Sequence, residues 1–126
     1  MHAVDTNVLM RLIMRDDPKQ AVIAEEFLNR GAWASHVVVA EVAWSLESNY
    51  GVDARGIASA IELLLDHPSL AMQDADVVRA AVAGFRRKPS VEFSDHLILE
   101  SARKAGHLPL GTFDRGLGRL DGAQKL

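Results

Sequence analysis

The chain has no cysteine among its 126 residues. This absence excludes disulfides, thiolate zinc sites and a cysteine nucleophile. Aromatic residues are scarce at 6%, and no apolar run approaches the roughly 20 residues that span a bilayer. The net charge of −3 argues against general electrostatic capture of nucleic acid. A polyanionic ligand would therefore have to meet local basic patches or bound cations.

The composition that remains is ordinary for a globular protein, with 48% apolar and 25% charged residues. The length suits one domain, and the sequence contains no repeat, low-complexity tract or linker. We therefore expect a single domain over residues 1–126. The N-terminus lacks a basic region followed by an apolar stretch and a cleavage site, so we expect a cytoplasmic protein without a targeting segment or membrane contact.

Short apolar stretches alternate with longer helical patterns along the chain. We expect strands at residues 3–5, 32–34, 70–73 and 108–113, and the last residues, GAQKL, suit an edge strand. Helical periodicity covers residues 7–14, 36–49, 53–66, 75–87 and 94–105, and a further helix follows Pro18 and is ended by Gly31. This alternation implies parallel strands joined by helical crossovers. The predicted fold class is α/β, a three-layer α/β/α sandwich with a central parallel sheet of four to five short strands.

Two acidic residues stand out in the first half of the chain. Asp5 falls at the end of the first predicted strand, where α/β sheets bind ligands, although helix capping by Asp5 or Thr6 accounts for it equally well. Glu41 is the only ionisable residue between Val37 and Leu46. A glutamate in so apolar a helix is expected to face a solvated cleft or a partner, or else a narrow exposed stripe.

Two further aspartates follow in the second half. Asp95 lies at or just inside a predicted helix start, and Asp114 follows the predicted strand two residues after Thr112. Helix capping and turn formation are the ordinary explanations for these positions. The capping box at Asp95 is incomplete, because neither Ser94 nor Asp95 has a Glu or Gln three residues later.

Together the four acids predict a metal site. Four carboxylates in one pocket cannot all stay ionised without a counter-charge. Mg²⁺ and Mn²⁺ prefer oxygen ligands of this kind. Zinc is disfavoured, because the five histidines are scattered without ligand spacing and there is no cysteine.

These motifs, in this order, resemble those of PIN domains, and most closely those of the VapC-type toxins of bacterial toxin–antitoxin pairs. The family's Asp-(Ser/Thr)-Asn run is matched by VDTNVLMRLI, and its glutamate in an apolar helix by Glu41 in VVVAEVAWSLES. Its helix-opening aspartate is matched by Asp95 in FSDHLI, and its Thr-Phe-Asp-(Arg/Lys) run by TFDRGLGRLDG. The resemblance extends from residue 3 to about 122 and implies a PIN-like fold. His96 departs from it, standing where members often carry a small residue. It would either tune the local charge or fill space, and we favour the second interpretation.

The resemblance implies a metal-dependent endoribonuclease. In this interpretation Asp5, Glu41, Asp95 and Asp114 hold one or two Mg²⁺ or Mn²⁺ ions, with Asp5 and Asp95 foremost. Water attack would leave 5′-phosphate and 3′-hydroxyl ends on the RNA. Thr6, Asn7 and Thr112 would position waters or phosphate oxygens. As a toxin, the protein would form a homodimer and bind a cognate antitoxin over its acidic groove.

Binding of the RNA substrate would have to depend on basic residues. The candidates for contacts to RNA phosphates are Arg11, Arg15, Arg86, Arg87, Lys88 and Arg115. For the run from Arg86 to Lys88, favourable interaction with a helix C-terminus is an equal explanation. Trp33 and Trp44 have apolar neighbours, so we predict that both lie in the core.

Two other functions compete with the nuclease. A phosphoryl-transfer enzyme or receiver domain also places aspartates at strand ends, but the residue two after Asp5 is Asn7 and PLGTFDRG contains no lysine. A catalytically inactive PIN-like module would bind RNA or a partner without cutting. Loss of cleavage by metal-loaded protein, with RNA binding retained, would distinguish that module from the enzyme.

Overall fold

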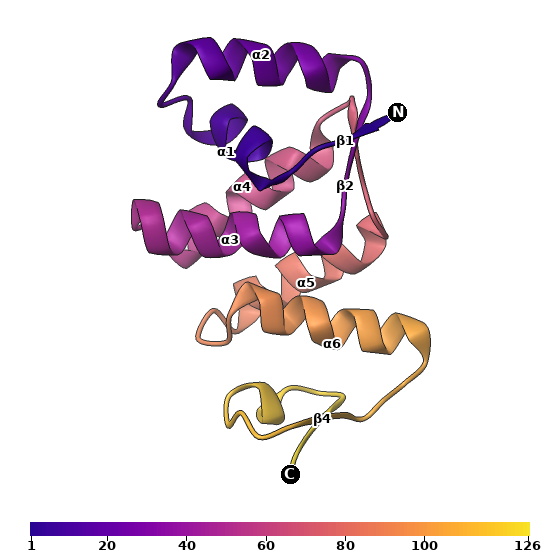
Figure 1. Cartoon of the computed structure of the whole chain (residues 1–126). Helices are drawn as coiled ribbons and strands as arrows, with labels where there is room; N and C mark the ends of the chain where they lie inside the picture. Colours follow the sequence, from indigo (N-terminus) through magenta and orange to yellow (C-terminus); the bar gives the residue numbers. More distant parts are fainter. The chain divides into compact units, whose positions relative to one another are not determined.

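The structure, a computed structural model, describes all residues from Met1 to Leu126. The chain divides into two compact units, Met1–Ala75 and Asp76–Leu126. Each unit has its own helices and its own parallel strands (Figure 1). None of the helices is both long enough and apolar enough to cross a membrane.

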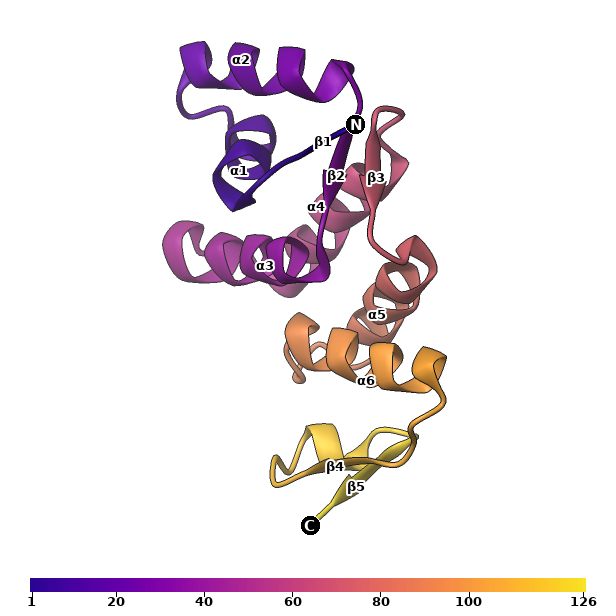
Figure 2. The ribbon, with the colours of Figure 1, turned by 45° about the vertical axis from the view of Figure 1, so that its right-hand side comes forward.

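The first unit is built on a parallel sheet of three strands in the order β1-β2-β3 (Figure 2). The strands are β1 (His2–Ala3), β2 (Ala32–Ala34) and β3 (Leu70–Met72). Helices α1 (Thr6–Met14) and α2 (Pro18–Asn29) connect β1 to β2, and α3 (His36–Tyr50) and α4 (Ala54–Asp66) connect β2 to β3. These helical crossovers are what allow successive strands to pair in parallel.

Short polar side chains start all four helices of this unit. In each case the N-cap side chain accepts a hydrogen bond from the backbone N–H three residues later, at 2.9 to 3.2 Å. The caps are Asp5, Asp17, Ser35 and Asp53. Such caps satisfy backbone donors that have no partner inside the helix. The starts of these helices thus follow from local sequence.

The second unit contains most of α5 (Ala75–Arg87), then α6 (Phe93–Ala105), β4 (Leu110–Thr112), the 3₁₀ turn η1 (Leu117–Arg119) and β5 (Ala123–Lys125). Strands β4 and β5 pair in parallel. A hydrophobic cluster joins α6 to this strand pair, and its members are Val91, Leu99, Leu117, Leu110, Leu120 and Ala123. Phe85 of α5 meets Phe93 of α6 edge to face, with ring centroids 6.0 Å apart.

The predicted α/β class with parallel strands is confirmed. All five expected strands are present, but they form a three-stranded and a two-stranded sheet, whereas we expected one sheet. Each strand is only two or three residues long. Strands this short specify their pairing partners only weakly. Here β5 is the parallel partner of β4.

His96 is the only buried polar or charged residue, with 3% of its surface exposed. Its Nε2 lies 3.0 Å from the Lys88 carbonyl oxygen, and its ring packs edge to face on Phe85. Gly84 of α5 leaves the room for this ring, because a Cβ there would lie 2.8 Å from His96 Nδ1. The interpretation of His96 as a space-filling residue therefore agrees with its packing.

We predict that Gly84→Ala destabilises the protein by about 1–3 kcal/mol, because the His96 ring is held in place and cannot yield to the added methyl group. Helix propensity alone would favour alanine by up to about 1 kcal/mol. The measurement is the free energy of unfolding in urea. Ala83→Gly, at the exposed neighbouring position in α5, is the control and should lose only the propensity term. A Gly84→Ala variant more stable than wild type would contradict the packing argument.

Candidate active site

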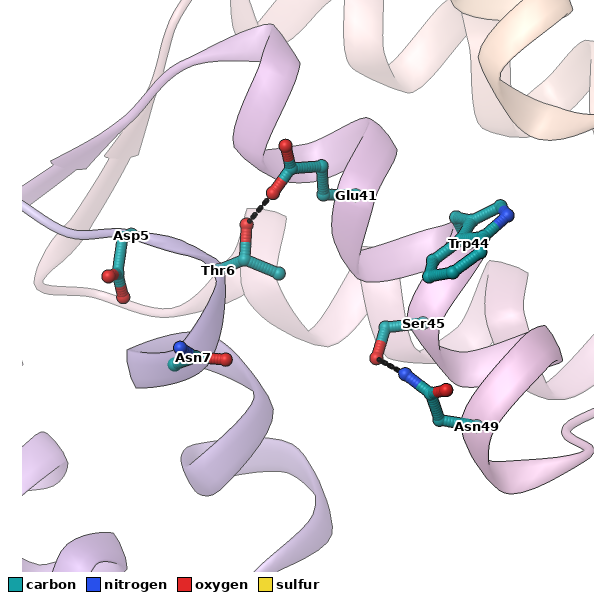
Figure 3. Close-up of a pocket in the computed structure, with 7 residues that line it drawn as sticks. All are labelled: Asp5, Thr6, Asn7, Glu41, Trp44, Ser45 and Asn49. Atoms are coloured by element: carbon teal, nitrogen blue, oxygen red, sulfur yellow. Dashed lines mark hydrogen bonds between the residues drawn. The ribbon is translucent and has the colours of Figure 1, made fainter.

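An open cavity of about 430 Å³ lies in the first unit (Figure 3). It is bounded by the start of α1 and by one face of α3. Its lining residues are Asp5, Thr6, Asn7, Glu41, Trp44, Ser45 and Asn49. The structure thus brings four of the predicted site residues together: Asp5, Thr6, Asn7 and Glu41. The lining mixes polar and apolar surface, and every charged group in it is a carboxylate.

Asp5 has two roles available to it, because its two carboxylate oxygens are in different situations. Oδ1 accepts a hydrogen bond from the Val8 backbone N–H at 3.2 Å and so caps α1. Oδ2 accepts no hydrogen bond. Asp5 is exposed and lines the cavity, so this oxygen is available to a ligand. Capping and ligand binding are therefore compatible explanations for this aspartate.

Glu41 is exposed on α3 and faces the cavity. Its Oε2 accepts a hydrogen bond from Thr6 Oγ1 at 2.6 Å (Figure 3). A short hydrogen bond to an ionised carboxylate is among the stronger ones in proteins. Thr6 therefore restricts the orientation of the Glu41 carboxylate across two helices that are far apart in sequence. Both expectations for Glu41 fit its environment: it lines the cavity, and it belongs to an exposed stripe of α3 that also carries Val37 and Trp44.

The prediction that both tryptophans lie in the core is wrong. Trp44 is 62% exposed and Trp33 39% exposed. On α3 the buried positions are Val39, Val42, Ala43 and Leu46, and Trp44 lies on the side that carries Glu41, three residues earlier. Apolar sequence neighbours misled the prediction, because helical neighbours point in different directions. Trp44 instead forms part of the cavity wall (Figure 3).

The second unit contains its own pair of carboxylates. Asp95 is the third residue of α6, whose N-cap is Glu92, so Asp95 is not the cap. Asp114 follows β4, and its Oδ1 accepts a hydrogen bond from the Leu117 N–H at 2.7 Å. The Asp114 N–H in turn donates to Thr112 Oγ1 at 3.0 Å. Thr112 thereby shapes the turn that presents Asp114.

Asp95 and Asp114 interact electrostatically. Burial raises the pKa of the half-buried Asp95 carboxyl, the negative charge of Asp114 raises it further, and His96 partly offsets both. A raised pKa means that the ionised form of Asp95 is disfavoured in the folded protein. A cation beside this pair would relieve both the desolvation and the repulsion.

The basic candidates differ in how far they are available to a ligand. Arg11 lies 3.4 Å from Asp16 and donates to Gln20 at 2.6 Å, and Arg15 lies 3.2 Å from Glu25. Their charges are therefore partly compensated within the first unit.

In the second unit, Arg86 already has an interaction partner, and Arg115 is exposed. Arg87 and Lys88 line a separate cavity together with Arg103 and Arg119. Sequence reasoning missed Arg103 and Arg119, and no local motif marks either of them.

The donor atoms fit a hard divalent cation. The first cavity offers carboxylate, hydroxyl and amide oxygens and contains neither histidine nor cysteine. Neither unit by itself gathers three or more His, Cys, Asp or Glu side chains that could hold a metal ion. Mg²⁺ does not require that many, because it keeps several waters and is commonly held by one or two carboxylates plus substrate phosphates.

Comparison with known proteins identifies a family. The sequence model of the PIN domain matches residues 3–123. No curated protein matches the chain. PIN domains are generally nucleases and typically depend on divalent metal ions.

Proposed function

Because this chain belongs to the PIN domain family, we propose that it is an Mg²⁺- or Mn²⁺-dependent endoribonuclease. The carboxylates we assign to the metal are Asp5 and Glu41 in the first unit and Asp95 and Asp114 in the second. The observation that carries the proposal is the pairing of Asp95 with Asp114. Burial and the negative charge of Asp114 both disfavour ionisation of Asp95, a perturbation that is typical of functional sites and that a bound cation would offset.

Each assigned residue has a distinct task. Asp5 and Asp95 are the foremost ligands, Asp5 because Oδ2 is free and Asp95 because its charge most needs compensation. Glu41 is oriented by Thr6, and Asp114 by the turn that follows β4. Asn7 lines the cavity and is available to position water or a phosphate oxygen.

A divalent metal ion held by these carboxylates would supply an activated water and would neutralise charge on the phosphoryl oxygens. In-line attack of water on phosphorus breaks the bond to the ribose 3′ oxygen. The products carry a 3′-hydroxyl and a 5′-phosphate. No covalent bond forms between the carboxylates and the RNA.

We also propose that the protein is the toxin of a VapC-type toxin–antitoxin pair. The support is the set of four motifs around Asp5, Glu41, Asp95 and Asp114. The cognate antitoxin would cover the acidic groove and so block metal and RNA. A homodimer is part of the same proposal. Both are tested by sedimentation of the protein alone and of the protein mixed with a candidate antitoxin.

The decisive experiment is cleavage of a total RNA pool by the purified chain with Mg²⁺ or Mn²⁺. Newly formed 5′-phosphate ends are mapped, and the controls are EDTA and the Asp5→Asn variant. We expect discrete cuts that disappear in both controls. Folded, metal-loaded protein that binds RNA without cutting would establish the inactive binding module instead.

A further prediction concerns Thr6 as a positioning residue. Thr6→Val removes the hydroxyl that holds Glu41 but keeps the shape of the side chain, so we expect kcat to fall about tenfold with KM nearly unchanged. Single-turnover cleavage measures this. Thr6→Ser restores the hydroxyl and should recover most of the rate. Equal rates for the valine variant and wild type would show that Thr6 does not position Glu41.

A further inference from the structure

The second unit contains a basic cavity of about 520 Å³ that the carboxylate site does not use. Its wall carries four cationic side chains, those of Arg87, Lys88, Arg103 and Arg119. Two anionic side chains, Glu100 and Asp121, also line it, so its formal net charge is +2 with His96 neutral. This local charge is opposite in sign to that of the whole chain, which is −3. A ligand that prefers this cavity is therefore an anion.

The charges of this cavity are only partly compensated. Arg103 is engaged, since its Nε donates to Glu100 at 3.0 Å and a terminal nitrogen donates to the Asp121 carbonyl at 2.7 Å. Arg87, Lys88 and Arg119 have no ion pair, and all three are exposed. Arg103 thus connects two parts of the cavity wall, and the cationic side chains of Arg87, Lys88 and Arg119 are available to bind a ligand.

The floor of the cavity is closely packed. It contains His96, which is buried, and Gly84, whose missing side chain gives the His96 ring its place. His96 also fixes the backbone of Lys88 through the 3.0 Å contact to its carbonyl oxygen. The end of α5 is therefore held against α6, and the cations are presented from fixed backbone positions.

The position of the cavity links it to the carboxylates. Asp95 directly precedes His96 on α6, and Arg103 lies eight residues further along the same helix. At 1.5 Å per residue this is about 12 Å along the helix axis. A single RNA strand of a few nucleotides spans such a distance.

We propose that this cavity binds a backbone phosphate of the RNA substrate, away from the bond that is cut. The proposal rests on the proposed nuclease function. An RNA phosphodiester keeps its single negative charge at neutral pH, and arginine matches its paired oxygens with two parallel donors. Arg87 and Arg119 are the residues that contact the phosphate, and His96 is a positioning residue that acts through Lys88.

The test compares two double variants that remove the same charge. Arg87→Gln/Arg119→Gln changes the cavity, and Lys19→Gln/Arg55→Gln changes exposed cations of the first unit. The probe is a labelled 12-nucleotide single-stranded RNA, titrated in EDTA at several salt concentrations. We expect the cavity variant to bind about tenfold more weakly, and its salt dependence, log K against log salt, to be shallower by about 0.7, the loss of one phosphate contact. The control should keep the wild-type slope.

Cleavage kinetics give a second readout. The cavity variant should show a raised KM with kcat unchanged, because the cavity does not touch the reacting phosphate. Equal losses of RNA affinity in both double variants, or no loss in the cavity variant, would overturn the proposal.

Failure of the nuclease proposal can be told apart from failure of this one. If wild-type protein neither binds nor cuts RNA, inorganic phosphate serves as the probe and amide chemical shifts of Lys88 and Leu120 as the signal. Shifts that disappear in the cavity variant support an anion site in a protein that is not a nuclease. Absence of shifts in wild type overturns the cavity proposal as well.

Discussion

The Asp95→Asn variant is expected to cut RNA about 1,000-fold more slowly than wild type, while its metal-free form melts at a higher temperature at pH 7. The loss of activity follows from removal of a charged metal ligand. The gain in stability follows from the raised pKa of Asp95, since the ionised carboxylate is unfavourable in the folded protein. Thermal melts with and without Mg²⁺ measure both parts, and Mg²⁺ should stabilise wild type more than the variant.

The sign of the pH dependence follows from the same shift. The folded protein binds a proton at Asp95 more tightly than the unfolded chain, where the pKa is near 3.8. Protonation of Asp95 therefore stabilises the fold below that value, and this stabilisation is lost as pH rises through the higher folded pKa. The stability of the variant relative to wild type should increase across this window, and the variant should remain the more stable protein at neutral pH. Cleavage by wild type should fall on acidification through the same window, because protonated Asp95 cannot bind a metal ion.

Asp76→Asn is the matched control for this experiment. A hydrogen bond from Lys104, at 3.0 Å, lowers the pKa of Asp76, which is fully exposed in the same unit. Its contribution to stability has the opposite sign, being present above its unfolded pKa and lost as pH falls. Asp76→Asn should therefore not raise the melting temperature at pH 7, and cleavage should be unaffected. A higher melting temperature in both variants would show that removal of any negative charge suffices.

The Asp5→Asn variant is expected to lose about 100- to 1,000-fold in cleavage rate at nearly unchanged stability. Asparagine caps helices about as well as aspartate, so the hydrogen bond from the Val8 N–H is preserved while the charge is lost. Asp5→Ala removes both functions and should lose about 1 kcal/mol of stability in addition. Cleavage assays and urea denaturation of the two variants separate the two roles of this residue.

Asp17→Asn and Asp17→Ala provide the comparison for Asp5. Asp17 caps α2 in the same way, through a hydrogen bond from the Gln20 N–H at 3.1 Å, but lies outside the cavity. Its alanine variant should lose similar stability, and both variants should keep full activity. An Asp5→Asn protein that cuts RNA at the wild-type rate would reduce Asp5 to a helix cap and remove it from the metal site.

Much of the fold is determined by local sequence. Asp5, Asp17, Ser35 and Asp53 start their helices through contacts three residues away, and periodicity places each helix within a few residues of its observed bounds. The identities of the four acids and their order were also sufficient to indicate the family, which the match over residues 3–123 confirms. These features depend on spacing along the chain, where the sequence is fully informative.

Other features depend on contacts between distant segments, and only the tertiary structure decided them. The hydrogen bond from Thr6 to Glu41 joins residues 35 apart, and the raised pKa of Asp95 arises from its burial and from the charge of Asp114, which follows it by 19 residues. Trp44 is exposed although its neighbours are apolar, because the direction of a side chain depends on which face of α3 packs inward. Arg119 reaches the basic cavity only through the turn after β4. Charge, burial and cavity shape at the proposed sites are set by such pairings, which residue spacing does not encode.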